Sequence, residues 1–184
     1  MQRMNPLTYS LCQKPVLGLV MFVTSMCAFP PLFQDAALPL QQAGAHLVEE
    51  FEAPVGKSYL LELKFRFPSA ASLAADEVVG SRYDKACPRN GEDIPAPQGS
   101  GLGRSIPVHV EVREQRSGAL VIDKTFHSLC VTSFGGHDAY TKTRTVGRLD
   151  LPAGSYRIDV RNLESQAGLD GVKTTVLLVA GHGK

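Results

Sequence analysis

One stretch of the chain alternates between apolar and polar side chains, and this pattern restricts the fold more than any other feature. The apolar set is Tyr59, Leu61, Leu63, Phe65 and Phe67, and the residues between them are Leu60, Glu62, Lys64 and Arg66. Successive side chains of a β-strand point to opposite faces, so the pattern predicts a strand with one core face and one solvent face. A sheet with one wet side is typical of antiparallel pairing.

Similar short runs recur along the chain and are separated by Gly, Pro and Ser. They cover residues 46–52, 106–114, 119–126, 129–134, 141–151, 156–163 and 172–180. Strands at this spacing predict a mainly β protein, an antiparallel β-sandwich of immunoglobulin-like or jelly-roll-like type with seven to eight strands. One short helix is expected within residues 69–79, because Ser69 can cap its start and Gly80 follows its end.

The first 27 residues have the pattern of a secretory signal peptide. Arg3 and Lys14 precede an apolar run over residues 16–29, which is too short to span a bilayer as a helix. We therefore expect an exported protein, periplasmic or secreted, with no transmembrane segment in the mature chain. Two alternatives stay open: residues 16–29 form a buried element of the domain, or Cys27 carries a lipid anchor.

Two further divisions follow from composition. Residues 28–45 are rich in Pro and Ala and show neither helical nor strand period, so they predict a flexible arm. Residues 46–184 then form a single β-sandwich domain.

The cysteine count depends on the leader. Its removal takes away Cys12 and Cys27 and leaves one pair, Cys87 and Cys130. In an oxidising compartment this pair predicts a disulfide, worth about 4 kcal/mol in the chain-entropy model. Two free buried thiols are the alternative.

Charge and motif content disfavour several classes of function. The formal net charge is +1, which argues against a nucleic-acid partner. Gly56-Lys57-Ser58 lacks the rest of a phosphate-binding loop and precedes a strand. The five histidines have no pair at the spacing of metal ligands, so neither a metal nor a cofactor is expected.

Two candidate binding surfaces remain. The first is a long loop that Cys87 would tie down; its candidate residues are Arg82, Tyr83, Asp84, Lys85, Arg89, Glu92 and Asp93. The second is a small basic stripe of shared strand parity, made of Tyr140, Lys142, Arg144 and Arg148. Such a stripe fits an acidic patch or an anionic glycan, and an ordinary solvated sheet face is the competing interpretation.

A hydrolase would require a nucleophile, a base and an orienting group. His127 and the pair His137 and Asp138 flank one predicted strand and are the candidates for such a site, with Ser133 close in sequence. No serine occurs in a nucleophile-elbow context.

The segment 148–164 contains a Leu-Pro-Ala-Gly corner followed by Tyr-Arg-Ile-Asp-Val. Together with residues 103–112 and 172–184, it resembles an exported proteobacterial family catalogued as a domain of unknown function, family 5625. The resemblance covers residues 46–184, implies a β-sandwich, and brings no catalytic residues.

These observations predict an exported, non-catalytic protein that binds another protein in the envelope or outside the cell, with effector neutralisation as one version. A glycan-binding or adhesion module is the alternative, which the absence of Trp weakens. A hydrolase built on His127, His137 and Asp138 is the second alternative.

Overall fold

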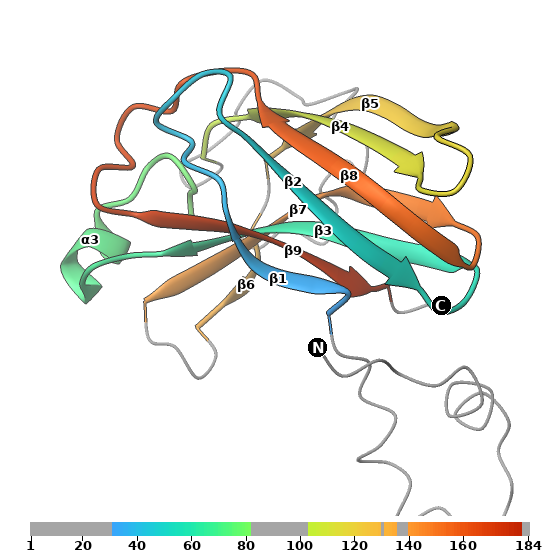
Figure 1. Cartoon of the computed structure of the whole chain (residues 1–184). Helices are drawn as coiled ribbons and strands as arrows, with labels where there is room; N and C mark the ends of the chain where they lie inside the picture. Colours follow the sequence, from blue (N-terminus) through green and yellow to red (C-terminus); the bar gives the residue numbers. More distant parts are fainter. Residues whose placement is uncertain (1–30, 82–102, 130, 136–139, 182–184) are drawn as a thin grey trace, which may run out of the picture.

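The computed structural model describes residues 31–81, 103–129, 131–135 and 140–181. Nine strands and one helix occur in these ranges, and the strands lie in two layers that face each other (Figure 1). The strands are β1 Phe33–Ala37, β2 His46–Ala53, β3 Lys57–Arg66, β4 Ile106–Glu114, β5 Leu120–Ser128, β6 Val131–Phe134, β7 Thr141–Leu151, β8 Gly154–Asn162 and β9 Lys173–Ala180. The helix is α3, Ala70–Ala74.

All the strand pairs are antiparallel. One sheet has the order β1-β9-β3-β7-β6 and the other the order β2-β8-β4-β5. The predicted antiparallel β-sandwich with one short helix is confirmed.

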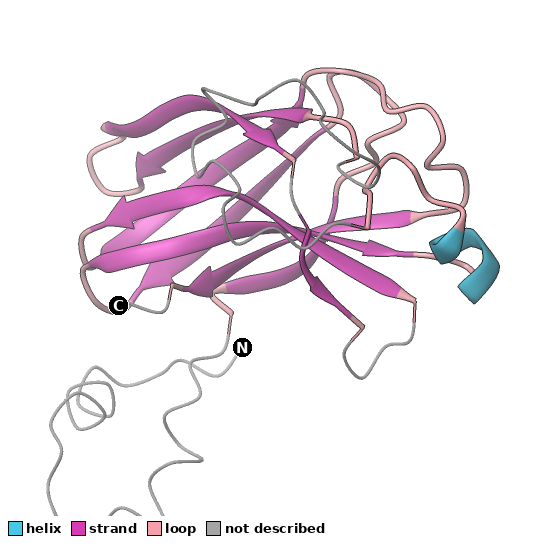
Figure 2. Cartoon of the chain, turned by 180° about the vertical axis from the view of Figure 1, so that it is seen from behind, coloured by secondary structure: helices cyan, strands magenta, loops and turns pink. Residues whose placement is uncertain are grey.

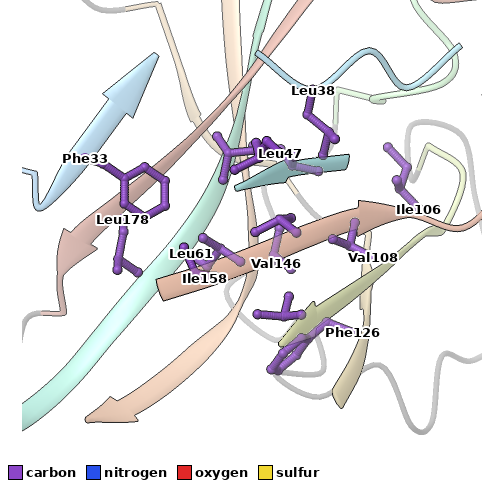
Figure 3. Packing of buried hydrophobic residues seen from close by; sticks show 14 of the residues in the cluster. Phe33, Leu38, Leu47, Leu61, Ile106, Val108, Phe126, Val146, Ile158 and Leu178 are labelled. Carbon is purple, nitrogen blue, oxygen red and sulfur yellow. The ribbon is translucent and has the colours of Figure 1, made fainter. Parts of the chain in front are cut away.

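One apolar core fills the space between the two sheets. The alternating set that begins at Tyr59 lies inside as predicted, since all five of its side chains are at most 4% exposed. From the opposite sheet, β4 and β8 contribute side chains that include Val108 and Ile158 (Figure 3). Burial of these matched faces is the main source of stability of a two-layer fold.

The predicted flexible arm over residues 28–45 is wrong from residue 31 onward. Within it β1 pairs with β9, and Leu38 and Leu40 are fully buried. The Leu38 N–H also donates to the Thr174 carbonyl at 3.0 Å. The pairing is with a strand near the other end of the chain, so no local periodicity reveals it.

The helix is confirmed but ends early. The Ser69 hydroxyl caps its start by accepting from the Ser72 N–H at 3.1 Å. The N–H groups of Val78, Val79 and Gly80 all donate to the Asp76 carboxylate instead of to helical carbonyls. This competition by an acidic side chain stops the helix before Gly80.

The two ends of the sandwich differ in the length of their connections (Figure 2). We call one the turn end; it carries the short connections 54–56, 115–119 and 152–153. We call the other the α3 end; it carries α3, the segment 75–81, residues 103–105 and the β5–β6 connection. No helix in the described part of the chain is long and apolar enough to cross a membrane.

Candidate functional site

The predicted long loop leaves and rejoins the sandwich at the α3 end. Its stems are Ser81 and Gly103, and its seven candidate residues from Arg82 to Asp93 lie outside the described residues. Cys27, Cys87, Cys130, His137 and Asp138 also lie outside them, so the disulfide and the lipid anchor stay predictions. The structure does describe what holds the two stems.

Arg144 joins both stems to the sheet. Its Nε donates to the Val79 carbonyl at 3.0 Å, and its Nη2 donates to the carbonyls of Val78 and Val79 at 2.9 and 2.5 Å. Its Nη1 donates to the Arg104 carbonyl at 2.7 Å and to the Ser128 carbonyl at 3.2 Å. A guanidinium has five N–H groups, so every one has a backbone acceptor here. Val78 and Val79 precede the loop and Arg104 follows it, so one side chain holds both stems.

Arg144 reaches the interior because of a β-bulge in β7. Opposite β3, Leu61 pairs with Gly147 but the next residue, Glu62, pairs with Thr145, which leaves Val146 as an extra residue. Such an insertion reverses the side-chain parity of everything beyond it.

The predicted basic stripe is therefore wrong as a surface. Arg148 lies on the C-terminal side of the bulge and is exposed, whereas Lys142 and Arg144, on its N-terminal side, are 2% and 0% exposed and face the core side. Tyr140 is exposed at the start of the hairpin, so the four residues share no common face.

Lys142 has a buried partner that the sequence did not reveal. Its Nζ lies 2.6 Å from Oδ2 of Asp76, and both side chains are at most 3% exposed. Its Nζ also lies 5.2 Å from the centre of the Phe67 ring. The Asp76 carboxylate thus accepts three backbone N–H groups and one ammonium, which satisfies a buried charge.

Burial sets the electrostatics of this cluster. Removal from water lowers the pKa of Arg144 from its ordinary value to about 10, and the nearby negative charge of Asp76 acts in the opposite direction. The guanidinium therefore remains charged at neutral pH. Its positive charge is balanced by carbonyl dipoles and by Asp76 rather than by water.

Gly103 is required where the downstream stem passes the guanidinium. A Cβ at this position would overlap Arg144 Nη2 and the Val78 carbonyl oxygen. The close approach of backbone to side chain explains a glycine at this stem.

Two aromatic side chains are exposed on the β6–β7 hairpin. Phe134 is 45% exposed and Tyr140 is 42% exposed, and they flank the hairpin connection. The Tyr140 carbonyl accepts from the Phe67 N–H at 2.9 Å, which ties this hairpin to the segment that enters α3. Phe134 is not among the residues predicted from the sequence, although its place at the end of a short run beside Gly135 was a usable signal.

His127, one of the residues of the hydrolase hypothesis, has one described side-chain partner. Its Nδ1 lies 3.3 Å from Oγ of Ser105, and Ser105 itself precedes β4. Among the residues that the structure describes, no group of three His, Cys, Asp or Glu is placed to hold a metal ion.

These features define the class of protein: it is an antiparallel β-sandwich domain, and buried charged side chains hold its α3 end. The chain belongs to the family described as "Domain of unknown function (DUF5625)", whose model matches residues 32–180.

A comparison with solved structures adds a similarity of fold and nothing about function. The crystal structure of a protein from Sulfurospirillum deleyianum is similar, with a TM-score of 0.63 and 19% sequence identity over 84% of this chain and 99% of that chain. No curated protein matches the sequence.

Proposed function

We propose that the protein is an exported, non-catalytic module that binds another protein through its α3 end. One observation carries the proposal: Arg144 uses all five of its N–H groups to hold both stems of the 82–102 segment. A buried charge is a poor way to gain stability, because apolar residues of similar volume often stabilise a fold more. Its advantage is a fixed position for the backbone that it contacts.

The proposed contact surface includes the β6–β7 hairpin. Phe134 and Tyr140 stand on a rigid base, because the neighbouring strand residues Lys142 and Arg144 are held in the interior. Exposed aromatics on a preorganised base are typical anchors of protein interfaces. Export rests on the leader pattern of residues 1–27, and neutralisation of an effector is one form that such binding takes.

The test is affinity capture from envelope extract with the wild type and with Phe134→Ser/Tyr140→Ser. Val48→Ser is the matched control, since Val48 is also an exposed apolar side chain but lies on β2. We expect the hairpin variant to bind the captured protein about thirtyfold more weakly, equivalent to about 2 kcal/mol for a central anchor. Equal affinity of all three proteins for every captured partner would refute this surface, and binding on a glycan array alone would favour a glycan-binding module.

A hydrolase is the second candidate, and the contact between Ser105 and His127 is the observation in its favour. A serine beside a histidine is two of the three parts of a nucleophilic site. If any hydrolytic activity is found, this candidate requires that Ser105→Ala abolish it; an unchanged rate would exclude Ser105 as the nucleophile.

A further inference from the structure

The four edge strands of the two sheets differ in how well they are protected. β1 and β6 have only five and four residues, and the pairing of each is interrupted by a register shift. β2 carries Glu49, Glu50 and Glu52. Short, irregular or charged edges resist pairing with another chain.

β5 is a different kind of edge. It has nine residues without Pro or Gly, and it lies at the margin of its sheet (Figure 1). Its pairing with β4 has one register shift, between Leu120 and Ile122, and is regular over the seven residues from Ile122 to Ser128. Along this stretch Asp123, Lys124, Thr125 and His127 are all exposed.

The two charges of β5 lie over their own sheet. Asp123 Oδ1 is 3.2 Å from His109 Nε2 on β4. Lys124 Nζ is 5.4 Å from the centre of the Phe126 ring. The charges that could block this edge are therefore directed onto neighbours within the same chain.

The sequence of β5 determines which symmetric pairing it favours. When two copies of a strand pair in antiparallel fashion about a two-fold axis, the residue on the axis faces itself. An axis at Asp123 or at Lys124 would set like charges directly opposite each other, which is unfavourable. An axis at Thr125 sets threonine against threonine and places Asp123 opposite His127 of the second copy, twice.

Both partners in that pair are suitable. Across β8, β4 and β5, one register row contains the carboxylates of Asp159, Glu111 and Asp123, and each of them has a basic side chain of the same chain beside it. Asp123 ends this row at the edge of the sheet, so a donor on a further strand would lie next to it. His127 contacts Ser105 through Nδ1, so Nε2 is the nitrogen directed to other partners. A carboxylate and a histidine ring that meet twice about the axis therefore favour β5 of a second copy as the occupant of this edge.

We propose that two copies of this chain associate through β5 in the register centred on Thr125, which joins their four-stranded sheets into one continuous antiparallel sheet. A single strand edge buries less than the roughly 800 Å² per partner of a standard stable interface. The dimer is accordingly weak and depends on concentration.

The test is sedimentation velocity of the purified full-length protein over a range of concentrations. The wild type is expected to shift from monomer to dimer as concentration rises. Asp123→Lys alone and His127→Asp alone are each expected to lose the dimer, since each removes the complementary pair. The double variant Asp123→Lys/His127→Asp reverses the pair and is expected to restore the dimer.

Glu50→Lys on β2 is the matched control, because it makes the same change of charge as Asp123→Lys on another edge strand. It is expected to dimerise like the wild type. Near-UV circular dichroism checks that each variant is folded. A wild type that stays monomeric up to millimolar concentration would overturn the proposal, as would a dimer that tolerates both single variants or a double variant that stays monomeric.

Discussion

At the turn end, two tyrosine hydroxyls close connections between strands, whereas at the α3 end one guanidinium does so. Tyr59 donates to the Val55 carbonyl at 2.8 Å, and Tyr156 donates to the Pro152 carbonyl at 3.0 Å. Each of these bonds joins residues four positions apart. The bonds of Arg144 join residues 16 to 66 positions apart.

The difference separates local from long-range closure. Each tyrosine hydrogen bond closes a single turn next to the strand that contains the tyrosine, so its loss is expected to affect that turn alone. The guanidinium collects four carbonyls from three segments of the chain, so its loss affects the loop stems and the end of β5 together. A side chain with one donor thus closes a short local turn, and a side chain with five donors joins segments that are far apart in the sequence.

Removal of Arg144 is expected to have the largest effect. Arg144→Ala leaves the carbonyls of Val78, Val79, Arg104 and Ser128 without their donor and the Asp76–Lys142 pair beside a cavity. We expect a loss of about 3–5 kcal/mol in the free energy of unfolding, measured by urea denaturation. Arg144→Lys should recover only part of this loss, because an ammonium has three donors and no planar fork.

A loss below about 1 kcal/mol for Arg144→Ala would mean that the α3 end does not depend on the guanidinium. The side-chain hydrogen bonds at the two ends of the sandwich would then contribute similar amounts to the free energy of unfolding, although they differ in geometry.

Two glycine substitutions compare the ends directly. At Gly103 a Cβ would overlap Arg144 Nη2, whereas at Gly56 the nearest atom to a Cβ is the Pro152 Cα at 3.6 Å, an ordinary contact. We expect Gly103→Ala to cost about 1–3 kcal/mol, as overpacked interiors do, and Gly56→Ala to leave the midpoint of thermal unfolding nearly unchanged. Equal midpoints for the two variants would show that the downstream stem adjusts freely.

Tyr156→Phe is expected to have a smaller effect at neutral pH than Arg144→Ala or Gly103→Ala, about 0.5–1.5 kcal/mol for one hydrogen bond. Burial, and secondarily the negative charge of Glu114, raises the pKa of Tyr156 above 10.0. The folded state therefore keeps this proton at a pH where the unfolded state releases it, and stability falls as pH rises from about 10 through the folded pKa. Tyr156→Phe should lose this part of the alkaline decline; an unchanged alkaline profile in urea denaturation would contradict it.

Much of the fold was predictable because its signals are local. The alternation that starts at Tyr59 gave β3 and its buried face, and β7 begins and ends at the predicted residues 141 and 151. β1 was missed because its partner β9 lies at the other end of the chain, and its five residues lack a clear period.

The site was less predictable than the fold. The parity rule that located β3 failed in β7, because one extra residue at Val146 turns Lys142 and Arg144 inward. Neither residue type nor spacing signals this bulge. Asp76 lies in a stretch read as helix, and its function as an acceptor for three N–H groups depends on the fold of the segment around it.

The anchor at Arg144 has a consequence for how freely this protein can vary. Every atom that accepts from the guanidinium is a peptide oxygen, and every residue type, proline and glycine included, has that oxygen. The side chains at positions 78, 79, 104 and 128 therefore supply no atom to these hydrogen bonds. The same four oxygens are present whichever side chains occupy these positions, so the hydrogen bonds of Arg144 set no requirement on residue type there.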